Sequence, residues 1–392
     1  MFKIQTLDKI TDHGLAELSN KHFTVSTSAK NPDGVLVKDH ILTQKDLNEN
    51  LKAIAETGTV TDNIPEESCS EKGIVVFNTP GANANAVKEL VIAGLLFASR
   101  NVIDGISWTQ SLTTADNVVD LVEKNKSRFI GPEISGRTLG VVGLGSIGVL
   151  VANACRGLGM RVLGYDPYIS VDAAWGLSRG VRKAPDLDSL LAECDYLSIH
   201  VPSNSETSDM FNADVFEKCK KGLRLLNFSS AEIVDNIAVK EAINNNTLAC
   251  YITDFPVKSL LGNNKIITIP NLGASTPESE DNCALMAAIQ LREYLLYGNI
   301  KNSVNFPDCE IPYTGKKRVC VIHRNVARLV GPITSLFADR GININNMLSK
   351  SKGDYAYTMI DIDADLVDGI EESLMSVDNV LKVRVIQRGD AR

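Results

Sequence analysis

Three glycines at a fixed spacing are the residues of this sequence that point most directly to chemistry. Gly143, Gly145 and Gly148 follow the apolar run TLGVV and open the helical pattern VLVANACRGLG, and Asp166 ends the next apolar run. In such a turn one glycine makes the tight bend, one lets the backbone approach a pyrophosphate and one allows close helix–strand packing. The spacing therefore predicts a dinucleotide site.

The same turn indicates which dinucleotide is expected. N–H groups at the start of the helix, at Ser146 and Ile147, lie at its positive dipole end and suit phosphate oxygens. Asp166 would accept hydrogen bonds from ribose hydroxyls and repel a 2′-phosphate, so we expect NAD rather than NADP. The alternative is a glycine-rich turn that binds no ligand.

Strand and helix patterns alternate around this turn. Strands are expected around Val37, from Leu51 and from Gly73, and a helix from Ala84 to about Asn101, which together predict a small α/β domain. After the turn, further strands are expected at 196–202, 224–229, 249–255 and 265–270. Their order, with helices between, predicts a doubly wound parallel sheet. After a polar segment containing Pro307 and Pro312, a βαββαβ order predicts a ferredoxin-like α+β domain.

Composition excludes several classes of partner. The chain has 392 residues, 44% of them hydrophobic, and a net charge of -8, which predicts two or three folded domains and argues against nucleic-acid or anionic-membrane binding. No apolar run reaches the roughly 18 residues of a membrane helix, and the N-terminus lacks the pattern of a signal peptide. Eight cysteines occur singly, so we expect no metal site and a reducing, cytoplasmic location.

Longer stretches resemble the D-2-hydroxyacid dehydrogenase family, and within it the D-3-phosphoglycerate dehydrogenases. The similar segments include GIVVFNTPGANANAVKELVIAGLLFASR, GVVGLGSIG, IHVPSNSETSDMF, LGASTPESEDNCA and NSVNFPDCE. The tail, with VIHRNV, GININNMLSKS and GDYAYTMIDID, is similar to the ACT domain that these enzymes often carry.

The resemblance implies three domains and an oligomer. Residues 1–97 and about 288–303 would form a flavodoxin-like substrate-binding domain, and residues 98–287 a Rossmann NAD-binding domain. Residues 304–316 would be a linker to an ACT domain at residues 317–392. Family members are dimers or tetramers, so we expect a homo-oligomer whose other partners are small molecules.

The family reaction moves a hydride from C2 of 3-phosphoglycerate to the nicotinamide, with a histidine as base, a glutamate beside it and an arginine on the carboxylate. The matching positions here hold Asn271, Lys258 and Ser230. Asn271 cannot exchange a proton at neutral pH, and a missing base costs ~10²–10⁴ in rate. Ser230 cannot make the forked contact of arginine. The resemblance thus predicts impaired catalysis, unless a desolvated Lys258 serves as the base.

Substrate contacts are implied at Glu56, Gly58, Val60 and Asn83. Glu56 stands where the family has a substrate-binding arginine, and Val60 where it has a glycine. A carboxylate at Glu56 would repel an anionic substrate, by about 1–4 kcal/mol for unit charges ~4 Å apart.

Two further positions match the nicotinamide half of the site. Thr207 and Asp254 are expected to contact the cofactor, and the alternative for each is a turn or strand-end cap. His200 matches a family position other than the base, and we expect it to pack or to form hydrogen bonds.

An effector site is implied in the ACT domain. His323, Asn325 and Asn343 match positions that hold a small amino acid, usually serine. Arg328 replaces the glycine of the family's N-x-P-G loop, and a side chain there tends to block a ligand that approaches the backbone.

Three functions remain open. The chain is an NAD-binding pseudoenzyme that acts as a regulatory or structural partner of an active paralogue, an oxidoreductase with a rebuilt site for another 2-hydroxy or 2-oxo acid, or a weakened phosphoglycerate dehydrogenase. The substitutions affect substrate, catalytic and effector positions and spare the NAD positions. Because random drift would not spare one site, this distribution favours the first.

Overall fold

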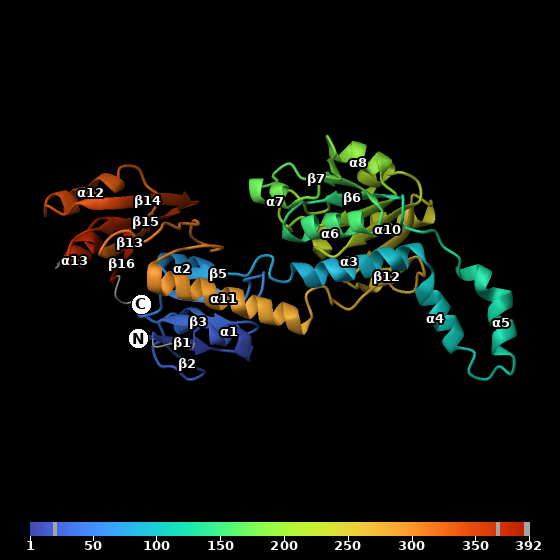
Figure 1. The fold of residues 1–392 in the computed structure, drawn as a ribbon, viewed down its shortest axis with the longest axis horizontal. Coiled ribbons are helices and arrows are strands. Elements are labelled where there is room, and N and C mark those ends of the chain that lie inside the picture. Colours follow the sequence, from blue (N-terminus) through green and yellow to red (C-terminus); the bar gives the residue numbers. More distant parts are fainter. Residues whose placement is uncertain (19–21, 366–368, 388–392) are drawn as a thin grey trace. The chain divides into compact units, whose positions relative to one another are not determined.

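The chain forms two compact units. The computed structural model describes residues 1–18, 22–365 and 369–387. One unit comprises residues 1–82 with 280–392, and the other residues 83–279 (Figure 1). The N-terminal fold and the C-terminal α+β domain thus belong to the same unit, whereas residues 83–97 belong to the unit that holds the glycine turn. The three-domain boundaries expected from the sequence stay a prediction.

The unit of residues 83–279 is built on a seven-stranded parallel sheet in the order β12-β11-β10-β9-β6-β7-β8. All five residues of β6 are buried, as parallel strands are when helices cover both faces of the sheet. The strands are β6 (Thr138–Val142), β7 (Arg161–Tyr165), β8 (Val181–Lys183), β9 (Tyr196–Ile199), β10 (Leu223–Asn227), β11 (Leu248–Thr253) and β12 (Ile266–Thr268). The predicted doubly wound sheet is confirmed.

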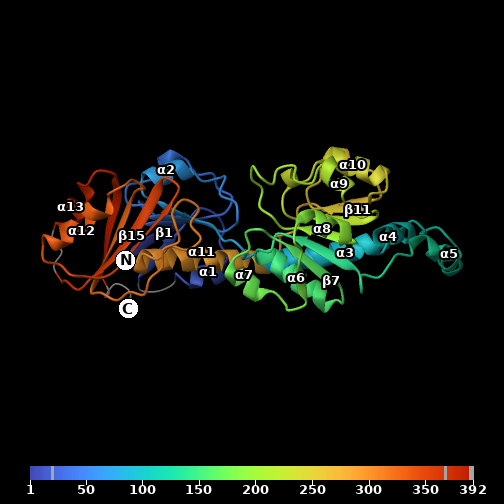
Figure 2. The ribbon, with the colours of Figure 1, turned by 90° about the horizontal axis from the view of Figure 1, so that it is seen from above.

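Helices cover the two faces of this sheet with separate cores (Figure 2). One core unites the sheet with α3 (Ala84–Ser99) and α6 (Ser146–Gly157). The other unites it with α8 (Leu187–Glu193), α9 (Ala213–Glu217) and α10 (Asn236–Asn244). Three short elements follow strand ends, namely α7 (Val171–Gly176) and the 3-10 turns η3 (Ala231–Ile233) and η4 (Lys258–Leu260).

A helical arm extends from the same unit (Figure 1). It consists of α4 (Val102–Gln110), α5 (Val118–Asn125) and the 3-10 turn η2 (Lys126–Phe129). In the part of the chain that the structure describes, none of the residues of α4 and α5 is buried. Among the described helices, none alone has the length and apolar character to cross a membrane, although α3 and α4, bent by 74° at their junction, meet that criterion as a pair.

The N-terminal part of the other unit is a five-stranded parallel sheet in the order β2-β1-β3-β4-β5. Its strands are β1 (Phe2–Thr6), β2 (Phe23–Ser26), β3 (Gly34–Val37), β4 (Ala53–Glu56) and β5 (Val75–Phe77). The helical elements are α1 (Asp12–Ala16), the 3-10 turn η1 (Gln44–Asp46), α2 (Glu66–Glu71) and the long α11 (Pro277–Tyr297), which returns to this sheet late in the chain. Side chains of α11 such as Leu291 and Leu295 complete its core.

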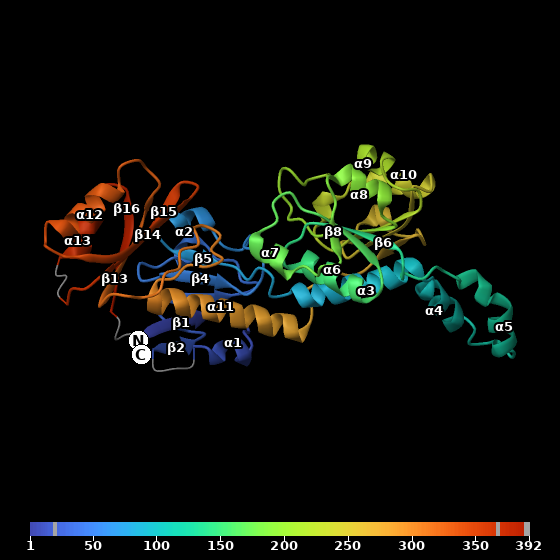
Figure 3. The same ribbon diagram turned by 45° about the horizontal axis from the view of Figure 1, so that its top comes forward.

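The C-terminal domain has the predicted βαββαβ order and an antiparallel sheet, β14-β15-β13-β16. Its elements are β13 (Lys317–Arg324), α12 (Val330–Ala338), β14 (Ile344–Lys352), β15 (Tyr355–Ile362), α13 (Ile370–Met375) and β16 (Val380–Gln387). Both helices pack on one face of the sheet (Figure 3). The opposite face, with Ile322, Tyr357 and Met359, shares a core with α11 and the N-terminal sheet. The sheet is therefore buried on both faces.

Candidate cofactor site

The glycine turn lies at the carboxyl end of β6, next to β9, where the order of the sheet reverses. Gly143 has a φ of 86°, and a Cβ on it would lie 2.5 Å from the carbonyl oxygen of His200. A Cβ on Gly148 would lie 1.9 Å from the carbonyl oxygen of Gly143. A Cβ on Gly145 would meet no atom of the described residues within 4 Å, so this backbone borders open space. This crevice is where open α/β sheets bind ligands.

Asp166 is attached to the glycine turn by its carboxylate. Its Oδ2 accepts the N–H of Leu144 at 2.8 Å, and its Oδ1 accepts the N–H of Tyr168 at 2.8 Å. Each carboxylate oxygen has a second lone pair. Asp166 is thus fixed in place and retains acceptor capacity for ribose hydroxyls.

A cavity of about 400 Å³ adjoins these residues. It is lined by residues of the glycine turn, of the β7 end and of the segment after β9, including Gly143, Gly145, Tyr168, Thr207 and Met210. Asp166 and Glu206 both line it. Two carboxylates oppose the extra charge of a 2′-phosphate, which supports the expected preference for NAD. Glu206 is not among the residues expected from the sequence, where its only signal is its place shortly after a strand that ends at the crevice.

Two residues expected at the nicotinamide half have different surroundings. The Thr207 hydroxyl donates to the carbonyl oxygen of Pro202 at 2.6 Å and accepts the N–H of Asn204 at 2.9 Å, so it caps its turn. Asp254 is 2% exposed, and burial raises the pKa of its carboxyl. Its Oδ2 accepts the N–H of Gly273 at 3.0 Å, whereas Oδ1 is buried without a partner among the described residues. An unpaired buried acceptor of this kind suits the amide of a nicotinamide.

His200 is a packed residue rather than an acid–base group. Burial lowers the pKa of its imidazole to about 3, so it is neutral at physiological pH. Its Nε2 lies 2.8 Å from the hydroxyl of Ser198.

The three catalytic positions follow three neighbouring strands. Ser230 follows β10, Lys258 follows β11 and Asn271 follows β12, all at the carboxyl edge of the sheet. The Ser230 hydroxyl donates to Glu232, and the backbone N–H of Asn271 donates to the carbonyl oxygen of Asp254 at 3.0 Å. Lys258 is exposed. A lysine base would need desolvation to lower its pKa, and within this unit Lys258 has not lost its contact with solvent.

The substrate positions divide between the two units. Glu56, Gly58 and Val60 belong to the unit with the N-terminal sheet, whereas Asn83 is the first residue of the other. Glu56 ends β4, is 2% exposed and accepts a hydrogen bond from Nδ2 of Asn63 at 3.0 Å. Burial raises the pKa of Glu56 to about 7. Val60 is 63% exposed.

The three effector positions do not come together within one chain. His323 pairs with Ala356 on β15, whereas β14 starts, directly after Asn343, with Ile344 opposite Ile362. Six residues along a strand correspond to about 20 Å. His323 is buried, and its Nε2 lies 2.9 Å from the Thr358 hydroxyl and its Nδ1 2.8 Å from the carbonyl oxygen of Arg324.

The loop that follows His323 keeps a backbone shape suited to glycine. Asn325 donates from Nδ2 to the carbonyl oxygen of Gly353 at 2.9 Å. Arg328 has a φ of 66°, in the left-handed region, at the position where the resemblance expects glycine. The described residues contain no group of three or more His, Cys, Asp or Glu side chains that could hold a metal ion.

Comparison with known proteins shows which protein family the part of the chain around the glycine turn is similar to. Residues 92–276 match the family "D-isomer specific 2-hydroxyacid dehydrogenase, NAD binding domain". The solved NAD⁺-bound 3-phosphoglycerate dehydrogenase of Entamoeba histolytica has a TM-score of 0.59 at 25% identity, over 78% of this chain and 98% of that one. Residues 92–276 of the chain are therefore similar to the NAD-binding domain of the D-isomer specific 2-hydroxyacid dehydrogenases.

Within this class the similar curated proteins are D-3-phosphoglycerate dehydrogenases. That of Archaeoglobus fulgidus is 35% identical over 67% of this chain and 49% of its own length. That of Haemophilus influenzae is 28% identical over 83% of this chain and 79% of its own length. The chain thus spans about half the length of the Archaeoglobus fulgidus protein and 79% of the Haemophilus influenzae protein.

Proposed function

We propose that this chain binds NAD(H) and transfers little or no hydride to or from 3-phosphoglycerate. The supporting observation is the contrast between two groups of residues at one edge of one sheet. The NAD positions keep the glycine turn, a fixed Asp166 and an unpaired acceptor on Asp254. Ser230, Lys258 and Asn271 provide neither an arginine nor an imidazole.

The chemical consequence concerns the substrate hydroxyl. NAD, when bound, supplies the hydride acceptor, and the protein must remove the hydroxyl proton. An amide such as Asn271 cannot take that proton. In addition, Glu56 replaces a cation on the substrate side with a group that is partly anionic near pH 7. The family reaction, oxidation of 3-phosphoglycerate to 3-phosphohydroxypyruvate in serine biosynthesis, would therefore be slow in this chain.

A paired titration tests this proposal. NADH binding is followed by fluorescence, and NADH formation from 3-phosphoglycerate and NAD⁺ is followed by absorbance with the same preparation. We expect saturable NADH binding with turnover at least ~10²-fold below that of an active relative, because the general base is missing. Asp166→Ala should weaken NADH binding, whereas Asp172→Ala, on the exposed α7, should not. Turnover at the rate of an active relative would refute impaired catalysis, and absence of NADH binding would refute the cofactor site.

The two other functions are distinguished by further measurements. Steady NADH oxidation with another 2-oxo acid would establish a rebuilt oxidoreductase. Association with an active phosphoglycerate dehydrogenase that changes the activity of that enzyme would establish a regulatory partner, and the C-terminal domain, which we propose to be an ACT domain, would then be its regulatory part.

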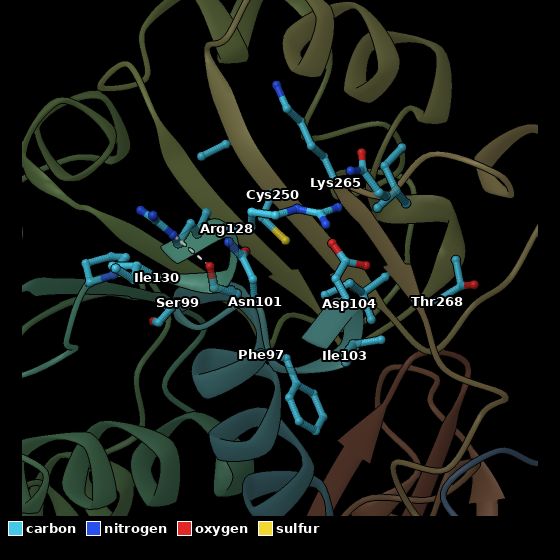
Figure 4. A pocket seen from close by; sticks show the side chains of 18 residues that line it. Phe97, Ser99, Asn101, Ile103, Asp104, Arg128, Ile130, Cys250, Lys265 and Thr268 are labelled. Carbon is cyan, nitrogen blue, oxygen red and sulfur yellow. Dashed lines mark hydrogen bonds between the residues drawn. The ribbon is translucent and has the colours of Figure 1, made fainter. Parts of the chain in front are cut away.

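We propose further that two copies of the chain associate through the α4–α5 arm. An isolated helix pair without a buried face is not stable in water. The arm exposes Ile106 (54%), Val118 (42%) and Val119 (77%), and its base borders a cavity of about 610 Å³ at the amino ends of β10, β11 and β12. In Figure 4 this cavity is lined by Arg128, Lys265 and Asp104, so charges of both signs border it. The exposed apolar side chains of the arm thus favour a second copy, which carries the same apolar residues, as its partner.

Val119→Asp tests the arm. It places a charge in the proposed interface, so light scattering should show a loss of dimer. Val171→Asp changes a residue of similar exposure (72%) on α7 and should leave the dimer intact. A Val119→Asp protein that remains dimeric would exclude this interface.

A cytoplasmic location is our third proposal. All eight cysteines lie in the described segments, are buried and form no disulfide. Burial raises the pKa of thiols such as those of Cys69 and Cys155 to about 12. Such unreactive thiols fit a reducing compartment.

A further inference from the structure

The C-terminal sheet is anchored to the N-terminal part of its unit by a buried arginine. Arg318 on β13 is fully buried, and its guanidinium binds the Asp361 carboxylate at 2.6 Å and 2.9 Å. It also donates to the carbonyl oxygens of Tyr297 at 2.8 Å, Ile311 at 3.2 Å and Pro312 at 3.1 Å. A forked pair with all donors engaged has little freedom to move.

A second set of contacts reaches the end of α11. Arg384 on β16 donates to the carbonyl oxygens of Tyr294 at 3.3 Å and Leu295 at 2.9 Å, and the Tyr357 hydroxyl donates to that of Gly298 at 2.7 Å. The last carbonyls of a helix lack partners within the helix and carry the negative end of its dipole, so arginine suits them. The C-terminal domain is thus held in one position on the N-terminal part.

This fixed arrangement forms a groove. A cavity of about 560 Å³ lies between the end of β14 and the segment after α11. Its lining residues are Asn78, Asn302, Ser303, Val304, Pro307, Asp308, Lys350, Ser351 and Lys352. Small-molecule sites range over about 300–1,000 Å³, so the volume suits a metabolite.

The walls of the groove are ordered by their own hydrogen bonds. Lys352 Nζ donates to the carbonyl oxygen of Ser303 at 2.8 Å. Asn302 has a φ of 58°, and its N–H donates to Asp308 Oδ1 at 2.8 Å while its side chain donates to Gln290 at 2.8 Å. Asp308 is therefore engaged with backbone. Lys350 is exposed and makes no hydrogen bond or ion pair through Nζ among the residues described in the structure.

We propose that this groove binds a small organic anion through a carboxylate or phosphate group placed on Lys350. Two lysines, Lys350 and Lys352, and one carboxylate, that of Asp308, line the groove, and the carboxylate already accepts a hydrogen bond, so the groove favours negative charge. Ser351 and Asn302 offer polar groups for hydroxyls of the same ligand. All residues that line the groove belong to one unit, and the glycine turn belongs to the other.

The position of the groove connects it to the substrate side. Asn78 lines the groove, and its Nδ2 donates to the carbonyl oxygen of Thr59 at 2.8 Å. The neighbouring Thr79 donates from its N–H and its hydroxyl to the carbonyl oxygen of Gly58 at 2.8 Å and 2.9 Å. An anion that contacts both Lys350 and the segment around Asn78 would therefore restrict the loop at Gly58 and Val60.

Calorimetric titration of the full chain at constant ionic strength tests the groove, with inorganic phosphate and 3-phosphoglycerate as probes. The informative variant is Lys350→Gln, because Lys350 makes no bond that holds the domains together. Lys301→Gln is the matched control, since Lys301 is an exposed lysine of the neighbouring segment outside the groove. We expect Lys350→Gln to weaken binding about tenfold, the loss of one charge-assisted contact, and the control to bind within about twofold of the natural chain.

Each outcome decides the proposal. Binding of both probes would indicate recognition of the phosphate group, and binding of 3-phosphoglycerate alone would indicate recognition of the carboxylate, provided in each case that Lys350→Gln weakens it. Absence of saturable binding to the natural chain, or equal binding by Lys350→Gln and Lys301→Gln, would overturn the proposal.

Discussion

Glu56 has surroundings unusual for a glutamate. It ends a parallel strand, is 2% exposed and has Nδ2 of Asn63 as a hydrogen-bond donor. Desolvation disfavours the ionised form, which is why the pKa rises to about 7. The resemblance implied a carboxylate that repels substrate, whereas the structure indicates a group that is only partly ionised near neutral pH.

The pKa of Glu56 makes stability depend on pH. Because the folded state holds this proton more tightly than the unfolded chain, whose pKa is near 4.5, the folded state binds more protons between pH 4.5 and about 7. The contribution of Glu56 to stability therefore falls as pH rises through this window. We expect Glu56→Gln to gain about 2–3 kcal/mol relative to the natural chain between pH 5 and pH 8, measured by urea unfolding. Glu67→Gln, at an exposed position, should show no such trend, and an equal trend in both would contradict the buried acid.

Arg328 carries backbone strain in the loop after β13. Its φ of 66° costs a non-glycine residue roughly 1–2 kcal/mol of folding free energy. Glycine avoids this cost, but it offsets part of the gain because it has more conformational freedom in the unfolded chain. Arg328→Gly should thus raise the free energy of unfolding by about 0.5–1 kcal/mol. Arg328→Ala removes the same side chain and keeps the strain, so it should give no gain. Equal effects of the two variants in chemical unfolding would exclude backbone strain as the cause.

At the scale of elements, α11 is the helix that joins the two parts of its unit. Its side chains complete the N-terminal core, and the carbonyls at its end accept hydrogen bonds from Arg384 and Tyr357 of the C-terminal sheet. This contact explains why β13 and β15 have nearly continuous buried runs, although an antiparallel sheet with one wet face would alternate.

Arg384→Met tests the role of this contact. The substitution keeps apolar volume and leaves the carbonyl oxygen of Leu295 without its donor, whereas that of Tyr294 still accepts the N–H of Gly298. It should lower the free energy of unfolding by about 1–3 kcal/mol. Arg324→Met removes an arginine that lies 4.6 Å from the centroid of the Tyr355 ring and forms a long ion pair with Glu71, at 3.9 Å, and should cost less than about 1 kcal/mol. Similar losses in both variants would argue against a specific role for the helix end.

At the scale of the whole molecule, the residues matched to substrate positions and those matched to catalytic positions belong to different compact units, so a test of the family reaction has to change both sets together. The combination of Glu56→Arg, Ser230→Arg and Asn271→His should raise NADH formation from 3-phosphoglycerate by at least ~10²-fold, because it restores the base and both cations. The same combination with Asn271→Gln lacks the base and should give little gain. No gain with histidine would mean that the matched positions, or the pocket they form, are wrong.

Much of the fold was predictable from local patterns. Several signals are properties of short segments, namely the glycine spacing, the apolar runs of β6 and β9 and the helical periodicity of α3. Each segment by itself restricts the backbone to one kind of element. For the same reason the glycine turn, Asp166 and the βαββαβ order followed from the residues without any contact information. The catalytic positions came only from resemblance to a family, and their roles stay predictions.

The tertiary structure decided what depends on segments far apart in the chain. The burial of Glu56, the separation of Asn343 from His323 and the groove at Lys350 arise from packing between residues tens to hundreds of positions apart. Periodicity indicates that a strand has a buried face, but it does not indicate which distant segment of the chain covers that face. By itself the sequence determined a sheet with an NAD-binding glycine turn and substituted residues at the positions matched to catalysis. Only packing decided that the C-terminal sheet is fixed on α11, because Arg318 and Arg384 donate to carbonyl oxygens at the end of that helix.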